Sequence, residues 1–288
     1  MPRLFERVTI AGVGLIGGSL ALAARAAGLV GEIIGYGRTE ANLQVAQRRG
    51  IVDRYSRDIV EAARDTDLLL LAVPVSAMAA VVRACTPVLR AGAVISDVGS
   101  VKARVVAEVE AVLPPELSFV GAHPIAGTEH SGAAAAFAEL FQGNRCIITP
   151  GRRTDPSAVA KVRALWEGVG MRVDEMDPAR HDLILAWVSH LPHAVAFSAV
   201  SAVLDADAAL AQFAGSSFRD LTRVAASSVE MWSDIFLANA AQVDAAIVKF
   251  IAVLEALRRA ITSGDEAELK RQLERARAAR QQWSAATR

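Results

Sequence analysis

The stretch Arg7-Val8-Thr9-Ile10-Ala11-Gly12-Val13-Gly14-Leu15-Ile16-Gly17 decides the fold. Residues 7–11 predict a short buried strand, and residues 19–27 continue in a helical pattern. Three glycines join the two segments in the G-x-G-x-x-G spacing of a dinucleotide-binding turn. Gly12 would permit the tight turn, Gly14 would let a pyrophosphate approach the backbone, and Gly17 would allow close helix–strand packing. The helix N-terminus would offer N–H groups to the phosphates. A glycine-rich turn without a ligand is the alternative.

Apolar segments alternate with helical patterns up to about residue 175. The further expected strands are residues 32–35, 68–73, 94–97, 119–122, 146–149 and 171–174. This alternation predicts a doubly wound, mostly parallel sheet. From residue 181 to 285 apolar residues recur at helical spacing, without a convincing strand. The sequence therefore predicts an α/β Rossmann-type dinucleotide-binding domain, residues 1–176, and an all-α domain, residues 177–288, for substrate binding and dimerisation.

Composition limits the classes of partner. Lys+Arg and Asp+Glu both number 31, so net charge gives no reason to expect nucleic acid or an anionic membrane. Residues 1–7 do not form a signal peptide, and charges and glycines are expected to interrupt every apolar run before about 18 residues. We therefore expect a soluble cytoplasmic protein. The two cysteines match no metal or redox spacing, and no metal-ligand set is found. Alanine-rich helices such as residues 186–204 need burial on several sides, which predicts a homodimer.

The end of the second strand bears on the choice of dinucleotide. An acidic residue there would bind the ribose hydroxyls of NAD, but residues 36–39 read Tyr-Gly-Arg-Thr. Arg38 and Thr39 suit a 2′-phosphate, so NADP is favoured over NAD. Arg38 as a solvated loop residue is the alternative, with Thr39 capping a helix over residues 39–49. The expected cofactor contacts are Gly12, Gly14, Leu15, Ile16, Gly17, Arg38, Thr39, Val73 and Pro74.

Two segments follow strands that should end at the cofactor crevice, namely residues 97–102 (Asp-Val-Gly-Ser-Val-Lys) and residues 121–129 (Gly-Ala-His-Pro-Ile-Ala-Gly-Thr-Glu). His123 follows a strand and precedes a proline, so it is well placed to accept a hydroxyl proton as hydride leaves. Ser100 either joins that chemistry or caps a helix that starts at Val101.

The helical half carries a second polar group of residues. Ser189 and His193 lie four residues apart and so share a helix face, while Pro192 should kink that helix. Two incidental histidines on a helix are the alternative. Arg223, presented from a mostly apolar helix, suits a carboxylate, although it could equally pair with Asp220.

Taken together, these segments resemble the prephenate/arogenate dehydrogenase family of tyrosine biosynthesis, from about Val8 to Gln282. The resemblance rests on five motifs in order: the residue 12–18 loop, residues 97–102, residues 121–129, Ser189-His190-Leu191-Pro192-His193, and residues 218–223 followed by Met231-Trp232. It implies two domains, a helical dimerisation domain, and oxidative decarboxylation of prephenate or arogenate with hydride transfer to NAD(P)+.

The resemblance also implies roles for single residues. His123 would be the catalytic histidine, and Ser100 would orient it. Trp232 would reach the site from the partner subunit, and Arg223 would bind the side-chain carboxylate. The substrate-binding set is Ser189, His193, Arg223, Trp232 and Thr128, and Glu129 with Asp220 would belong to a gating ionic network. The chain departs from some members at residues 215–217 and at Ser228, which bears on the choice between prephenate and arogenate.

Two other functions remain open on the sequence alone. A dehydrogenase of the 3-hydroxyacid type would use a lysine early in the helical domain, but no lysine lies between Lys161 and Lys249. A non-catalytic dinucleotide sensor could keep the same fold. The presence of Ser100, His123, His193 and Arg223 together argues against a sensor.

Overall fold

The predicted α/β sheet is present in the computed structural model, which describes residues 3–128 and 130–286. Its strands lie in the order β3-β2-β1-β4-β5-β6-β7-β8, and all neighbouring pairs are parallel except β6 and β7. The strands are β1 (Phe5–Ala11), β2 (Val30–Tyr36), β3 (Arg54–Ser56), β4 (Leu68–Leu71), β5 (Val94–Asp97), β6 (Ser118–Ile125), β7 (Arg145–Pro150) and β8 (Arg172–Glu175). The mostly parallel, doubly wound fold is confirmed. The short edge strand β3 was not predicted.

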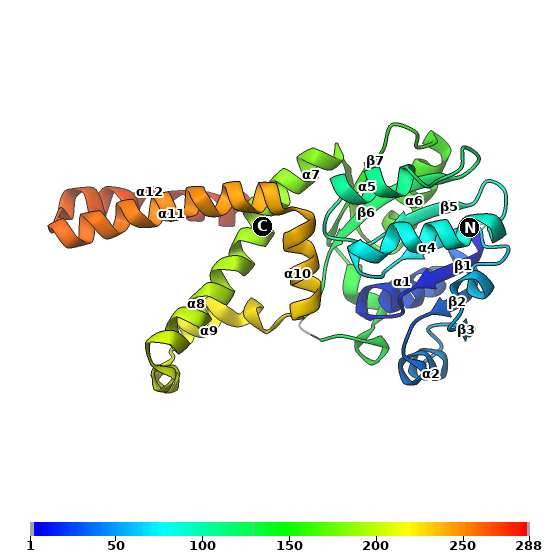
Figure 1. Ribbon diagram of the computed structural model, residues 1–288, viewed down its shortest axis with the longest axis horizontal. Coiled ribbons are helices and arrows are strands. Elements are labelled where there is room, and N and C mark those ends of the chain that lie inside the picture. The colour runs from blue at the N-terminus through cyan, green and yellow to red at the C-terminus, as the bar shows by residue number, and fades with distance from the viewer. Residues whose placement is uncertain (1–2, 129, 287–288) are drawn as a thin grey trace. The chain divides into compact units, whose positions relative to one another are not determined.

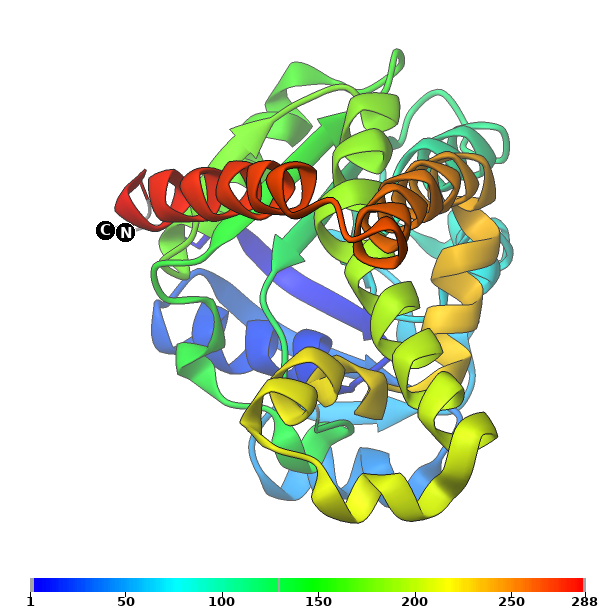
Figure 2. The same cartoon turned by 90° about the vertical axis from the view of Figure 1, so that its left-hand side faces the viewer.

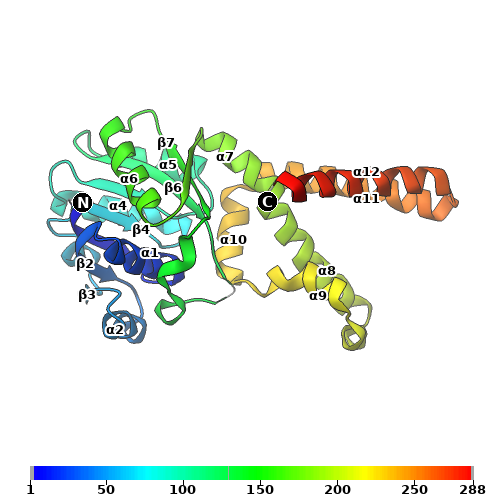
Figure 3. The same cartoon turned by 180° about the vertical axis from the view of Figure 1, so that it is seen from behind.

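Helices cover both faces of the sheet. α4 (Met78–Cys85) and α5 (Ala103–Glu110) lie on the near face in Figure 1, and α1 (Leu15–Ala26) and α6 (Pro156–Gly168) lie on the near face in Figure 3. Two separate clusters of buried apolar side chains fill these interfaces, one with α1 and α6 and the other with α4 and α5. Neighbouring residues of β4 alternate between the two clusters, so this strand is buried on both faces.

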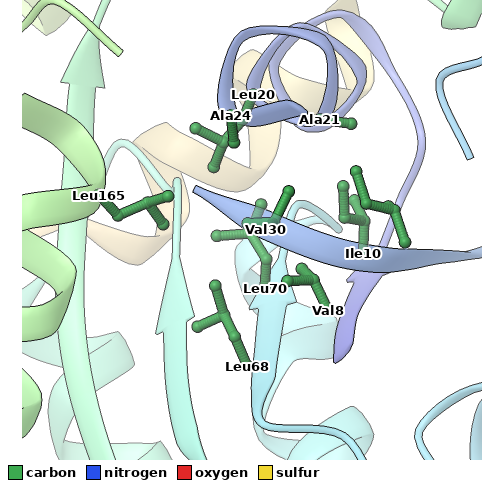
Figure 4. A pocket seen from close by; sticks show the side chains of 10 residues that line it. Val8, Ile10, Leu20, Ala21, Ala24, Val30, Leu68, Leu70 and Leu165 are labelled. Carbon is green, nitrogen blue, oxygen red and sulfur yellow. The ribbon is translucent and has the colours of Figure 1, made fainter. Parts of the chain in front are cut away.

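A small apolar void lies in the first of these interfaces. Figure 4 shows side chains of β1, β2, β4, α1 and α6 around it, among them Ile10, Leu20 and Leu165. Every residue that lines this void is apolar, so it offers a ligand no hydrogen bond. We assign it to the packing of the core.

The chain divides into two compact units, Met1–Ala240 and Ala241–Arg288. Besides the sheet and its helices, the first unit holds α2 (Glu40–Arg48), α3 (Ile59–Ala62), α7 (Pro178–Leu185), α8 (Leu191–Asp207), α9 (Ser216–Thr222) and α10 (Val229–Ala238). α8 packs against α9, as Figure 2 shows. The second unit consists of α11 (Ala240–Ser263), whose first residue is the last of the first unit, and α12 (Glu266–Ala286). Gly264 adopts a φ of 67° between them, the left-handed conformation that ends many helices.

A π-helical turn, Ala186–His190, joins α7 to α8. Pro192 lies in the first turn of α8, where its missing N–H costs no regular helical bond. The predicted disturbance around Pro192 is therefore a widened turn before it.

One expectation about apolar runs is wrong. The helical run Pro178–Phe213 is long and apolar enough, by length and composition, to cross a membrane, and little of its most apolar part is buried. Residues 183–204 contain no Asp, Glu, Lys or Arg. Helices whose apolar faces are covered by protein pass the same test, so the run is weak evidence for a membrane span.

Candidate active site

The glycine-rich turn lies where the strand order reverses, at the carboxyl ends of the adjacent strands β1 and β4. Gly12 has a φ of 102°, and a Cβ there would lie 2.2 Å from the Ala72 carbonyl oxygen. A Cβ on Gly17 would lie 2.5 Å from the Gly12 carbonyl oxygen, whereas one on Gly14 would meet no protein atom within 4 Å. The space above Gly14 is thus open, while the other two glycines are required by the fold itself.

The residues around this turn fit a dinucleotide. Gly14 is the N-cap of α1 and has no side chain to cap the helix, so the first N–H groups, at Leu15 and Ile16, are left for a ligand. Val73 packs against the second apolar cluster, and Pro74 precedes a short 3₁₀ turn, Val75–Ala77. Both residues directly follow β4, at the same edge of the sheet.

The end of β2 has no free carboxylate nearby. Arg38 is exposed and makes no ion pair among the described residues. Thr39 is the N-cap of α2, as predicted, but its side chain makes no capping hydrogen bond. Glu40, the first acid after the strand, accepts a hydrogen bond from the Tyr55 hydroxyl at 2.6 Å. Arg38 and Thr39 are therefore the polar side chains available to a ligand at this end.

His123 lies within β6 rather than in the loop after it. The sequence predicted that the strand would end at residue 122, but β6 continues to Ile125 because β7 pairs with it, with His123 opposite Ile147. The imidazole is buried, and burial is the main reason that its pKa lies well below the usual value, with His181, Lys102 and His190 lowering it further. His123 is therefore neutral at pH 7 and able to accept a proton.

The hydrogen-bond partner of His123 is His181, which the sequence analysis did not single out. His123 Nδ1 lies 2.8 Å from His181 Nε2, and His181 Nδ1 lies 2.7 Å from Asp182 Oδ1. Ser100 makes no hydrogen bond to His123 among the described residues. The expectation that Ser100 orients this histidine is thus not met by direct contact.

Asp182 also holds the start of α5. Its carboxylate accepts the backbone N–H of Lys102 at 2.7 Å and that of Ala103 at 2.9 Å. The alternative in which Ser100 caps a helix from Val101 is wrong, because α5 begins at Ala103 and its acceptors come from α7. A carboxylate at the N-terminus of a helix is favourably placed in the helix dipole.

A buried ion pair lies beside His123. Lys102 Nζ pairs with Asp97 Oδ2 and donates to the Ala122 carbonyl oxygen at 2.9 Å, and both charged side chains are fully buried. Asp97 also accepts the N–H groups of Gly99 and Ala122. Burial lowers the Lys102 pKa and Asp97 opposes this effect. The pair fixes the residue 97–102 segment against the strand that carries His123.

His190 and Asn239 extend the polar cluster. Asn239 Nδ2 donates to the Asp182 carbonyl oxygen at 2.9 Å and lies 3.2 Å from His190 Nδ1. Burial lowers the His190 pKa to about 4. His190 is therefore neutral, and because Nδ1 faces the amide donor, its proton lies on Nε2, where the Ser100 backbone is the polar group nearby.

The predicted helical motif, residues 189–193, spans the π-helical turn and the start of α8, and its His193 contacts α10. His193 Nδ1 donates to the Ser189 backbone carbonyl oxygen at 2.9 Å, and the shared face of the two side chains stays a prediction. The Trp232 indole stacks on the His193 ring. Trp232 is buried in its own chain, and its expected service to the site of a partner subunit stays a prediction.

Three further residues assigned by resemblance are exposed, namely Thr128, Asp220 and Arg223. Arg223 begins a 3₁₀ turn after α9, and its charge is close enough to lower the His193 pKa, below the larger effect of burial. Among the described residues Arg223 makes no ion pair with Asp220. The Thr128 hydroxyl accepts the His130 N–H at 3.2 Å. Glu129 lies outside the described residues.

α10 also contacts the segment after β4, where the dinucleotide is expected to bind. The Ser76 N–H donates to Asp234 Oδ2 at 3.2 Å, so α10 meets the turn that follows Pro74. Figures 1 and 3 show α10 beside the sheet. His123, His193 and the expected dinucleotide contacts thus belong to one compact unit. Among the described residues no group of three or more His, Cys, Asp or Glu side chains is arranged to hold a metal ion.

The residues missed by sequence reasoning are His181, Asp182, Lys102, His190 and Asn239. Several of the hydrogen bonds that join them to the site span long stretches of sequence, for example 58 residues between His123 and His181. One signal was available: His181-Asp182 places two polar residues at the start of the longest uncharged apolar stretch of the chain.

Comparison with known proteins agrees with this geometry. Residues 20–175 match the family model described as prephenate dehydrogenase, nucleotide-binding domain, and residues 177–275 match the model described as prephenate dehydrogenase, dimerization domain. Cyclohexadienyl dehydrogenase of Zymomonas mobilis is 39% identical over 91% of this chain and 90% of its own length.

Two solved structures are similar over nearly the whole chain. Prephenate dehydrogenase from Aquifex aeolicus, in complex with hydroxyphenyl propionate and NAD+, has a TM-score of 0.90 and 36% identity over 96% of this chain and 98% of that one. Synechocystis arogenate dehydrogenase has a TM-score of 0.80 and 28% identity over 96% and 99%. The chain belongs to the prephenate dehydrogenase family.

Proposed function

We propose that this protein catalyses the oxidative decarboxylation of prephenate, arogenate or both, with hydride transfer to NAD(P)+, to give 4-hydroxyphenylpyruvate or tyrosine. The observation that carries the proposal is His123, a neutral buried imidazole beside the residue 97–102 segment, in the same unit as the glycine-rich turn. Family membership supports the same reaction.

His123 acts as the general base. It accepts the proton of the substrate ring hydroxyl as hydride leaves the carbon that bears this hydroxyl, which gives a ketone. Loss of carbon dioxide from the ketone is then favourable because an aromatic ring forms. The nicotinamide dinucleotide, when bound, accepts the hydride. Ser100, in the loop between β5 and α5, is proposed to contact the same hydroxyl.

The substrate side chain binds opposite His123. Arg223 takes the side-chain carboxylate, since its guanidinium is exposed and lies near His193. Ser189, His193, Trp232 and Thr128 complete the substrate contacts. Glu129 and Asp220 are proposed to take part in an ionic network that gates the site.

We propose NADP as the preferred cofactor. Two observations support this preference: Arg38 is exposed without an ion pair among the described residues, and Glu40 is held by Tyr55. A 2′-phosphate suits an arginine and a free threonine hydroxyl, whereas NAD usually meets a carboxylate at this position. The turn residues from Gly12 to Gly17, with Val73 and Pro74, would hold the rest of the dinucleotide.

We further propose a cytoplasmic homodimer that pairs through residues 177–288. Large apolar side chains are exposed along α8, α10 and α11, including Val188, Leu204, Leu237 and Ile251, and the matching family model is described as a dimerization domain. A second subunit would cover them. Both cysteines are reduced and buried, which suits a reducing compartment. The domain boundary at residues 176/177 stays a prediction.

Absorbance at 340 nm with NADP or NAD, and with prephenate or arogenate, tests the reaction in four pairings. We expect reduction in at least one pairing, and a fall of about 10²–10⁴-fold in turnover for His123→Asn, as for a lost general base. No reduction in any pairing, together with dinucleotide binding, would favour the sensor function instead. Near-normal turnover of the variant would remove His123 from its role.

A further inference from the structure

The carboxylate of Asp182 determines where the protons of two histidines lie. A carboxylate only accepts hydrogen bonds, and this one already receives the N–H groups of Lys102 and Ala103. The ring atom 2.7 Å away, His181 Nδ1, must therefore donate. Burial lowers the His181 pKa, so this ring is neutral at pH 7 and its Nε2 carries a lone pair.

The same reasoning extends to His123. Its Nδ1 lies 2.8 Å from the His181 Nε2 lone pair and must donate to it. The neutral His123 ring then has its lone pair on Nε2. This atom makes no hydrogen bond among the described residues. Which ring nitrogen of a neutral histidine carries the proton is set by the hydrogen bond that the other nitrogen makes, and a His123 ring protonated on Nε2 could not use that atom as a base.

We propose that His181 and Asp182 are positioning residues that hold His123 in the Nδ1-protonated tautomer, leaving Nε2 free to accept the substrate proton. When Nε2 takes that proton, His123 becomes an imidazolium whose Nδ1–H bond to His181 strengthens. The Asp182 carboxylate, which accepts the His181 Nδ1–H, stabilises the charge through His181. The proposal rests on the proposed role of His123 as base.

The surroundings make this orientation matter. The titratable groups packed around the two rings are Lys102, Asp97, Asp182, His190 and Cys146. Lys102 disfavours an imidazolium at His123, and its charge is offset by Asp97. Asp182 is the buried carboxylate that is connected to His123 Nδ1 by two hydrogen bonds, one on each side of the His181 ring. Asp182 also accepts the first N–H groups of α5, so the same carboxylate positions both His181 and the end of the residue 97–102 segment.

The tautomers can be measured without turnover. The chain has only five histidines, so ¹⁵N-histidine labelling and long-range ¹H–¹⁵N correlation spectra resolve each ring. At pH 7.5 we expect His123 and His181 as neutral rings protonated on Nδ1, assigned by their loss in His123→Asn and His181→Gln. A His123 ring protonated on Nε2 would overturn the proposal, whatever the enzyme's activity.

Two substitutions test the consequence for catalysis. His181→Leu removes the acceptor, and we expect kcat to fall by about 10²–10³-fold with KM changed less than about threefold. His181→Gln offers an amide oxygen to His123 Nδ1, so kcat should stay within about tenfold of the wild type. Equal kcat in both variants contradicts the proposal.

The outcomes separate this proposal from the function. If the wild type reduces neither cofactor but the tautomers are as stated, the function fails and the orientation by His181 stands. If His181→Leu does not fold, the spectra and the glutamine variant still decide. Thermal unfolding of each variant shows whether a loss of kcat reflects a loss of the folded state.

Discussion

The indole of Trp232 stacks on the imidazole of His193, with ring centroids 3.6 Å apart and planes 22° from parallel. The residues come from α10 and α8, and Trp232 also contacts Phe236 and His190 by ring edges. This stack fixes the ring of a proposed substrate contact without any hydrogen bond to it from α10.

We expect Trp232→Ala to raise the KM for the cyclohexadienyl substrate at least tenfold and to lower Tm. The buried indole contributes about 3–5 kcal/mol to folding. Trp232→Phe keeps an aromatic partner for His193, so its KM should remain within about threefold of the wild type. Steady-state kinetics and thermal unfolding of the two variants measure both effects. A similar KM in both variants would show that the stack does not position His193.

Gly14→Ala and Gly17→Ala should have opposite effects on folding and on binding. A Cβ at position 14 meets no protein atom, so Tm should be unchanged while the Kd for the dinucleotide rises about tenfold or more. A Cβ at position 17 would lie 2.5 Å from the Gly12 carbonyl oxygen, and such overpacking costs about 1–3 kcal/mol. Differential scanning fluorimetry without cofactor and titration calorimetry with it distinguish them. Tighter dinucleotide binding by Gly14→Ala would place the phosphates elsewhere.

Arg38→Ala should weaken NADP binding selectively. A charged hydrogen bond contributes about 1.5–3 kcal/mol, which corresponds to about a 10–100-fold rise in Kd. The Kd for NAD should change little, since NAD lacks the 2′-phosphate. Arg48→Ala, an exposed arginine at the end of α2, is the matched control and should leave both values unchanged. An equal rise for NAD and NADP would argue against a role of Arg38 in cofactor choice.

Stability should fall as the pH falls from about 6.5 towards about 4. In the folded state burial lowers the His190 pKa to about 4, whereas the unfolded chain has the usual value of 6.5. Between these values the unfolded state binds more protons, so acid favours unfolding. His123, His181 and His193 have lowered pKa values and act in the same direction.

Thermal unfolding at several pH values measures this dependence. His190→Asn keeps an acceptor for Asn239 and removes one of the titrating groups, so its Tm should fall less steeply between pH 6.5 and 4. The wild-type curve over the same pH range is the reference. A steeper fall of Tm for His190→Asn would contradict a lowered His190 pKa in the folded state.

Periodicity and glycine spacing were enough to predict most of the sheet. The run of leucines in β4 is buried on both faces, as continuous apolar strands in parallel sheets are, and the glycine spacing predicted the turn between β1 and α1. β3 was missed because it is a polar edge strand of three residues. β6 was predicted too short because its last residues pair antiparallel with a later strand, a contact that no local pattern reveals.

The site was predictable only where its residues carry local motifs. His123, Ser189 and His193 stand in recognisable patterns, and the structure brings them into one unit. The partners of His123 depend on how α7 packs against the sheet and α5, so nothing near residue 123 points to His181 or Asp182. The stacking of Trp232 on His193 joins α10 to α8, a contact that sequence order alone does not predict.

The pairing of β6 with β7 keeps the reactive histidine within the rigid frame of the sheet. Its ladder extends through His123 to the pair Ile125–Arg145, and the chain leaves the sheet only after that point. If His123 is the base, substitutions after Ile125 would leave its position unchanged, because the ladder that holds it ends before them.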